Sequence, residues 1–301
     1  MPPAAQESFA VESLVIDPRR RLVEALPVKE RQLRLNGVIT SVLEGGEGPP
    51  IVLLHGPGAY AAQWIRIIPA LVATHRVIAP DLPGHGASEF FGGGLTLARV
   101  AGWLDDLIEC TCVRAPVLVG HTLGGAVAAR FAAESSRSLD RLVLVDSLGL
   151  SEFRPTASFG AALHAYLQSP DAHTHDGLWA QCVFDLEGVK RRLGEHWQWI
   201  KAANLDHSRP AEMAALNDWM EVFGIPAIPP ATLAEIEVPT ALIWGRHDQA
   251  TPLAVAEAVS KQFAWPLEII DRAADDPALE QPEAFIAALG AAGVQPCHSK
   301  E

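Results

Sequence analysis

Short apolar runs alternate with amphipathic segments along most of this chain. The apolar runs typical of buried parallel strands lie at residues 50–54, 76–79, 115–119, 142–146, 240–244 and 267–270. The segments with a helical pattern include residues 96–109, 253–263 and 283–289. Two further runs, 32–35 and 38–43, flank Asn36-Gly37, a dipeptide that favours a tight antiparallel hairpin. Strands separated by helices predict an α/β fold, with a mostly parallel sheet and helices on both of its faces.

One long segment interrupts this alternation, and we interpret it as a helical lid inserted into the core. Its large side chains include Trp179, Trp197, Trp199, Trp219, Phe159, Phe184, Phe223, Met213 and Met220. The predicted boundaries are 1–29 for an N-terminal extension, 30–149 and 235–293 for the core, 150–234 for the lid and 294–301 for a C-terminal tail. The aromatic side chains either form the lid's own core or line an apolar pocket, for which Trp179 and Trp219 are candidates.

Composition narrows the class of protein and of partner. With 301 residues, of which 49% are hydrophobic, the chain can bury a large core. Its formal net charge of -13 opposes binding to nucleic acid and to anionic membrane surfaces. No apolar run approaches the ~20 residues that span a bilayer, and the N-terminus lacks a leader pattern, so we expect a soluble, cytoplasmic protein. The expected partner is a small-molecule substrate, and the sequence does not indicate the oligomeric state.

The 4 cysteines indicate neither a disulfide framework nor a metal site. Only Cys110 and Cys112 are close in sequence, and no second cysteine pair or histidine cluster lies near them. His173 and His175 have H-x-H spacing, but no further ligands accompany them. We therefore expect no metal and no other cofactor.

The stretch from Ala115 to Arg130 carries the strongest chemical indication. Its apolar run breaks at Gly120-His-Thr-Leu-Gly124 and resumes as an alanine-rich helical pattern, which predicts a strand, a sharp turn and a helix. Glycines two before and two after the central residue fit a nucleophile elbow, where strand and helix approach closely. The central residue is Thr122, whose β-branched side chain is stiff and suits a strained turn poorly.

Several ordered motifs together point to one family. In chain order they are His55-Gly56, Asp81-Leu-Pro-Gly-His-Gly-Ala-Ser88, the elbow, Trp244-Gly-Arg-His-Asp248 and Leu279-Glu-Gln-Pro-Glu-Ala-Phe285. With them the chain resembles the α/β-hydrolase family from about residue 33 to 289, in its branch of epoxide hydrolases, C–C hydrolases and esterases. The resemblance implies a Ser, Asp, His triad in chain order. The nucleophile position is Thr122, the acid position is Asp248, and the histidine position falls on Asp275.

The resemblance also implies an oxyanion hole made by two backbone N–H groups. Leu123, which follows the nucleophile position, supplies one of them. The residue after His55-Gly56 is Pro57, which has no N–H, so Gly58 is the candidate for the second donor. His121 is a candidate wall residue of the pocket, although strand alternation predicts that it points to the opposite side from Thr122.

Asp248 and Asp275 can form a catalytic pair of acids if they face each other under the lid. Two carboxyls in one dry site do not both ionise readily, so they share a proton at a raised pKa and can act as general acid and base. Alternatively, Arg246 or Arg272 neutralises them in a structural ion pair, or Asp275 belongs only to the turn that starts the next helix.

Three functions follow from these residues. The first is an enzyme of hydrolase ancestry that uses Thr122, Asp248 and Asp275 on a small, mostly apolar carbonyl, ester or epoxide-type substrate. The second is a non-hydrolytic acid-base enzyme, such as an isomerase, lyase or cyclase. The third is a catalytically degenerate protein that only binds a small apolar ligand. Loss of the serine or histidine of a triad lowers turnover by roughly a million-fold. The threonine and the aspartate at these two positions therefore bear directly on the choice among the three functions.

Overall fold

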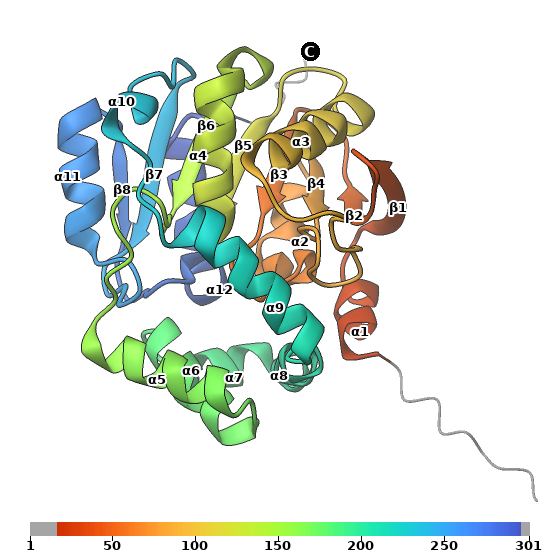
Figure 1. Ribbon diagram of the computed structural model, residues 1–301, viewed down its shortest axis with the longest axis vertical. Helices are drawn as coiled ribbons and strands as arrows, with labels where there is room; N and C mark the ends of the chain where they lie inside the picture. Colours follow the sequence, from red (N-terminus) through yellow and green to blue (C-terminus); the bar gives the residue numbers. More distant parts are fainter. Residues whose placement is uncertain (1–16, 296–301) are drawn as a thin grey trace, which may run out of the picture.

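The computed structural model describes residues 17–295, and at its centre is an 8-stranded sheet with the order β1-β2-β4-β3-β5-β6-β7-β8 (Figure 1). The strands are β1 (Lys29–Leu35), β2 (Val38–Gly45), β3 (Pro50–Leu54), β4 (Arg76–Pro80), β5 (Val117–His121), β6 (Arg141–Val145), β7 (Thr240–Gly245) and β8 (Leu267–Ile270). From β4 to β8 along this order every neighbouring pair is parallel, whereas β2 is antiparallel to both β1 and β4. The prediction of a mostly parallel sheet is confirmed.

The antiparallel edge begins with the predicted hairpin. Leu35 pairs with Val38 across a two-residue turn in which Asn36 has φ 44° and Gly37 has φ 83°. Positive φ at both central residues belongs to a type I′ turn, whose twist matches that of the two strands. The Asn-Gly dipeptide therefore fixes the register of the hairpin.

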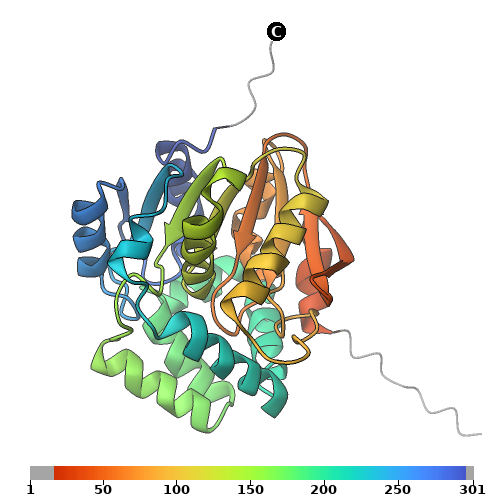
Figure 2. The same cartoon turned by 45° about the horizontal axis from the view of Figure 1, so that its top comes forward.

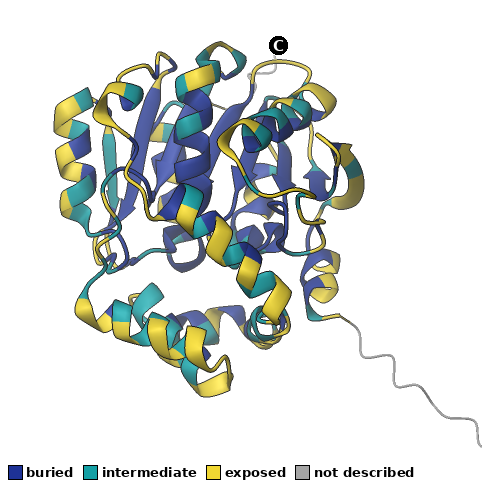
Figure 3. Ribbon diagram, in the orientation of Figure 1, coloured by how far each residue is buried: buried dark blue, intermediate teal, exposed yellow. Residues whose placement is uncertain are grey.

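Helices cover both faces of the sheet. They are α1 (Pro18–Glu24), η1 (Ala61–Arg66), α2 (Ile68–Leu71), α3 (Leu97–Thr111), α4 (Leu123–Ser135), η2 (Ser136–Ser138), α11 (Leu253–Phe263), α12 (Pro277–Glu280) and α13 (Pro282–Ala291). Successive strand residues enter two separate apolar clusters: Leu118 packs with α3 and α4, and Val119 packs with η1, α12 and α13. Figure 3 shows strands β3 to β7 as the buried layer between these helices, whereas the edge strand β1 is largely exposed. Both faces of the central strands are therefore apolar, as the continuous runs predicted.

A second group of helices is inserted between β6 and β7. It consists of α5 (Ala157–Gln168), α6 (Ala172–Cys182), α7 (Leu186–Leu193), α8 (Glu195–Asp206), α9 (Pro210–Trp219), the short η3 (Met220–Gly224) and α10 (Pro230–Leu233). In Figures 1 and 2 helices α5 to α9 gather at one end of the sheet, and we call these five the inserted helices. The boundaries given above for core and lid stay predictions, and residues 1–16 and 296–301 of the two terminal segments lie outside the described residues. Within the described chain, no helix is long and apolar enough to cross a lipid bilayer.

Candidate active site

The elbow forms where β5 ends and α4 begins. Thr122 stands between them with φ 46° and ψ -107°, a backbone conformation that is strained for a β-branched residue. Its neighbours hold it there: the N–H of Thr122 donates to the carbonyl of Val145, and its carbonyl accepts from the N–H of Leu148. A Cβ atom on Gly124 would lie 2.4 Å from the carbonyl oxygen of Leu54, so only glycine lets α4 approach the sheet this closely.

The hydroxyl of Thr122 is buried and has no hydrogen-bond partner among the described residues. The residue is 5% exposed and lines a cavity between the sheet and the inserted helices. A Cβ atom on Gly56 would lie 2.4 Å from its Oγ1. The hydroxyl therefore occupies space that the glycine after β3 leaves open, on a residue of the cavity wall.

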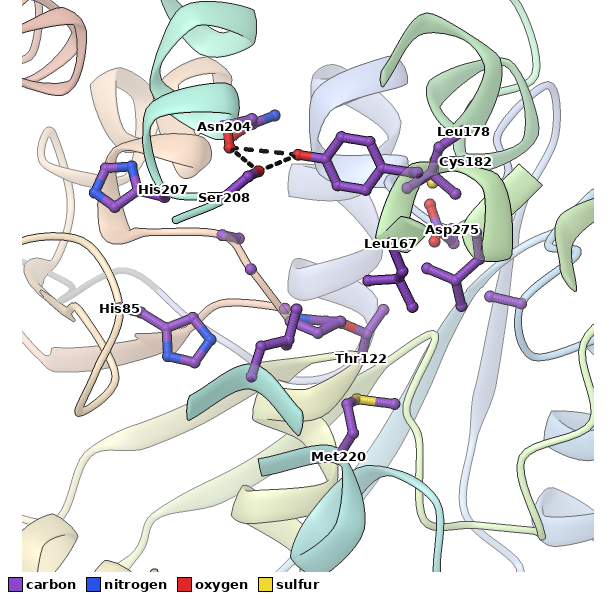
Figure 4. Close-up of a pocket in the computed structure, with 18 of the residues that line it drawn as sticks. His85, Thr122, Leu167, Leu178, Cys182, Asn204, His207, Ser208, Met220 and Asp275 are labelled. Atoms are coloured by element: carbon purple, nitrogen blue, oxygen red, sulfur yellow. Dashed lines mark hydrogen bonds between the residues drawn. The ribbon is translucent and has the colours of Figure 1, made fainter. Parts of the chain in front are cut away.

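Asp275 lies in the wall of the same cavity, on the loop between β8 and α12 (Figure 4). Its backbone N–H donates to the carbonyl of Cys182 at the end of α6, 3.1 Å away. Burial raises the pKa of the Asp275 carboxyl well above its ordinary value, and the charges of Asp248, Asp276 and Glu280 raise it further. The structure thus brings Asp275 and Thr122 to one cavity, as the sequence predicted for them.

Asp248 lies behind this wall rather than in it. It is 6% exposed, and its Oδ1 accepts from the N–H groups of Ala250 and Thr251 at 2.7 and 2.9 Å, while its Oδ2 has no partner in the described structure. Burial raises its pKa to about 7, although the hydrogen bonds from the two N–H groups lower it. Asp248 therefore does not line the cavity, but its charge raises the pKa of Asp275, which does.

A third carboxyl, Asp146, belongs to the same group and was missed by the sequence analysis. It directly follows β6 with φ 43°, and its Oδ1 accepts from the N–H of Gly245 at 2.8 Å. Burial raises its pKa well above the ordinary value, and the charge of Asp248 raises it further. The carboxyl ends of β6, β7 and β8 thus each deliver one aspartate, a pattern that parallel strand order could have revealed.

His121 is placed differently from the prediction of strand alternation. Its ring lies in the wall of the cavity, where Nε2 contacts the backbone carbonyl of Asp275 and the ring packs against Trp64. The alternation argument fails because the positive φ of Thr122 ends the strand and turns its side chain toward the same cavity. A histidine that donates from Nε2 to a carbonyl keeps Nδ1 as an acceptor.

The two candidate oxyanion donors come from the start of α4 and from the loop after β3. Leu123 is the first residue of α4, so its N–H has no partner within the helix. Gly58 lies in the cavity wall with φ 66°, after Pro57, which has no N–H. Whether the two N–H groups converge on a reacting oxygen stays a prediction.

Of the two tryptophans predicted for the pocket, one lines the cavity and the other does not. Trp179 of α6 lies in the cavity wall and also packs against Trp197 of α8, so it serves both the pocket and the packing of the inserted helices. Trp219 does not line the cavity: it is 2% exposed, and its Nε1 donates to the carbonyl of Pro83 at 2.8 Å. The buried indole N–H requires a partner, and that bond holds Trp219 behind the wall.

The cavity has a volume of about 220 Å³ and is lined by the sheet edge and the inserted helices. An engineered protein cavity of about 150 Å³ holds benzene, so this one admits a single ring with a short substituent. Figure 4 shows wall residues that sequence reasoning did not single out for the pocket, among them Cys182, Leu167, Met220 and Ser208. Burial raises the pKa of the Cys182 thiol well above its ordinary value, and the charge of Asp275 raises it further. Among residues 17–295 no group of three or more His, Cys, Asp or Glu side chains is arranged to hold a metal ion.

Comparison with known proteins places this site in a family. The model of the alpha/beta hydrolase family matches residues 51–288. The chain belongs to the alpha/beta hydrolase family. Its members share the strand, elbow and helix described here, with the reacting groups at the carboxyl ends of the strands.

Individual relatives are hydrolases. The chain is 28% identical over 236 residues to 2-hydroxy-6-oxo-6-(2'-aminophenyl)hexa-2,4-dienoic acid hydrolase from Metapseudomonas resinovorans, covering 75% of this chain and 77% of that protein. It is 30% identical over 226 residues to 2-hydroxy-6-oxo-6-phenylhexa-2,4-dienoate hydrolase from Comamonas testosteroni, covering 70% and 75%. The solved structure of the enzyme of that name from Rhodococcus sp. strain RHA1 superposes with a TM-score of 0.75 at 26% identity, covering 89% of this chain and 99% of that one.

Proposed function

We propose that this protein hydrolyses small, mostly apolar carbonyl, ester or epoxide-type compounds that bind under a lid formed by the inserted helices. The observation that carries the proposal is the Thr122 hydroxyl, which is buried and unpartnered in the described chain and belongs to a residue that lines the same cavity as Asp275. The relatives named as hydrolases support the reaction class. Their substrates are not carried over, because the cavity decides the substrate.

The roles follow from the positions of the groups. Thr122 Oγ1 attacks the carbonyl carbon of an ester, its proton passes to the carboxylate of Asp275, and that proton then goes to the departing alcohol. Water hydrolyses the acyl-threonine in the reverse sense and returns the proton to Oγ1. The N–H groups of Leu123 and Gly58 stabilise the oxyanion. A raised pKa makes ionised Asp275 a stronger base than an ordinary carboxylate, and Asp248 contributes to that rise.

A second candidate is a non-hydrolytic acid-base reaction. The observation that favours it is that no hydrogen bond joins Thr122 Oγ1 to any base in the described part of the chain. Asp275 with Asp248 behind it can exchange a proton with a bound carbonyl compound without a covalent intermediate. In that case Thr122 only donates a hydrogen bond to the substrate.

Hydrolysis of a short-chain aryl ester by the purified protein tests the proposal. Wild type is compared with Thr122→Ala, with the double variant Thr122→Ser, Asp275→His, and with Asp271→Asn as a control at an exposed carboxyl on the same loop. We expect measurable turnover that Thr122→Ala lowers by at least about a hundredfold and that the control retains. An inactive wild type beside an active double variant would contradict hydrolysis and support the acid-base reaction.

A further inference from the structure

Apart from histidines, the charged groups in the cavity wall are all of one sign. Its carboxyl groups belong to Asp275, Asp276 and Glu212, and no lysine or arginine lies among its lining residues. Glu212 is paired with Arg209, which is 61% exposed and outside the wall. The other two carboxyls line the cavity together with Thr122. The wall therefore offers titratable carboxyls and no lysine or arginine.

The buried histidines of the wall do not supply a positive charge. Burial lowers the pKa of His85 to about 3, and burial also lowers the pKa of His175, so both are neutral at physiological pH. His121 contacts the carbonyl of Asp275 through Nε2, and His207 contacts the carbonyl of Gly86 through Nε2 and that of Ala203 through Nδ1; carbonyl oxygens accept, so these ring nitrogens are donors. The wall therefore offers a carboxylate ligand no lysine or arginine.

The acids also have no cationic partner inside the protein. No salt bridge of the described residues includes Asp275, Asp276, Asp248 or Asp146. Burial raises the pKa values of Asp275 and Asp276, and the charges of neighbouring carboxyls raise that of Asp275 further. A cation placed in the cavity would relieve that repulsion.

Two observations independent of the acids describe the ligand that fits. The buried Thr122 hydroxyl, unpartnered within residues 17–295, is ready to accept an N–H at the acidic end of the cavity. The opposite walls are apolar and aromatic and include Phe153, Phe159, Tyr166 and Trp179. Aromatic faces attract cations and cover apolar rings, and the volume of about 220 Å³ limits the body to about one ring.

We propose that this cavity takes an organic amine, with a one-ring apolar body against the aromatic walls and its ammonium group between Asp275 and Thr122 (Figure 4). The proposal rests on the proposed function in taking this cavity as the substrate site, and it narrows the substrate to amine-bearing compounds. It also separates this chain from relatives whose names specify a dienoate, which is an anion. An ammonium group has three donors, which the carboxylate and the hydroxyl can accept.

Binding of three matched probes, measured by calorimetry at pH 7.5, tests the proposal without any turnover. The probes are benzylamine, benzyl alcohol and benzoate, which share one ring and differ in charge. We expect benzylamine to bind at least about tenfold more tightly than benzyl alcohol, and benzoate to bind least. Equal or tighter binding of benzyl alcohol, or preference for benzoate, would overturn the proposal. Because no reaction is followed, failure of the ester assay and failure of this ranking are separate results.

Variants at two aspartates test which carboxyl is responsible for the preference for amines. Asp275→Asn removes the charge and keeps the size, so benzylamine affinity should fall to that of benzyl alcohol, whose own affinity stays within about twofold. Asp271→Asn is the matched control, since this carboxyl is 73% exposed and pairs with Arg246. Retention of the amine preference in folded Asp275→Asn, judged by circular dichroism, would contradict the assignment. If that variant does not fold, the order of the three probe affinities for the wild-type protein still tests the proposal.

Discussion

Replacing Asp248 by asparagine should stabilise the protein at alkaline pH. The asparagine side chain would keep the acceptor oxygen that Ala250 and Thr251 bond to, and its amide would present N–H donors where Asp248 Oδ2 has no partner in the described structure. The carboxyl, in contrast, must ionise in a buried site as the pH rises. The variant removes that cost and leaves the backbone bonds intact.

The magnitude follows from the pKa of Asp248 in the folded protein. It is raised from 3.8 to about 7, so the folded state binds the proton more tightly than the unfolded state. The stability that this proton contributes is complete below pH about 4 and is lost as the pH rises to about 7. At ~1.36 kcal/mol per pKa unit the loss is at most on the order of 4 kcal/mol, or roughly 6 °C in Tm for a chain of this length.

Thermal unfolding followed by circular dichroism at pH 5 and pH 8 checks this prediction. We expect Asp248→Asn and wild type to unfold within about 2 °C of each other at pH 5, and the variant to be several degrees more stable at pH 8. Asp271→Asn, at an exposed carboxyl, should show no such pH-dependent difference. A variant destabilised equally at both pH values would refute the reasoning, because Asp248 would then act through its hydrogen bonds alone.

Three further predictions concern the cavity. Gly56→Ala places a Cβ 2.4 Å from Thr122 Oγ1, so kcat for the aryl ester should fall at least about tenfold; unchanged kcat would remove Thr122 from the chemistry. Because its pKa is raised, Asp275 gains base form as the pH increases beyond the range of an ordinary carboxyl, so kcat/KM should rise with pH in wild type and stay flat in Asp275→Asn. Glu280→Gln keeps one acceptor for the two N–H groups of Ala274 and Phe184, so stability should fall by ~1–3 kcal/mol in urea unfolding, whereas exposed Glu283→Gln should change little.

The sequence predicted the elements that depend on local chemistry. The hairpin turn follows from the dipeptide Asn36-Gly37, whose two residues both have positive φ. The elbow around Thr122 follows from glycines that allow close approach. These features need only a few neighbouring residues, so a single sequence contains enough information to predict them.

The arrangement of the site depends on residues far apart in the chain, and there the sequence was less informative. Asp146 was read as the end of a strand, because nothing local shows that it meets Asp248 across β6 and β7. The orientation of His121 differs from the prediction because the strained residue Thr122 ends the strand alternation. Trp219 was indistinguishable from Trp179 by composition, and only the partner of its indole N–H placed it behind the wall.

The hydrogen bond from the Asp275 N–H to the Cys182 carbonyl makes the position of Asp275 depend on that of α6. It joins the loop that carries the acid to the last residue of α6, and the Phe184 N–H joins the same segment to Glu280. A displacement of α6 would break or strain these bonds and shift Asp275. The position of this carboxyl therefore depends on a helix that is remote from it in sequence, and a substitution that displaces α6 should alter the acidic end of the cavity without touching any of its carboxyl groups.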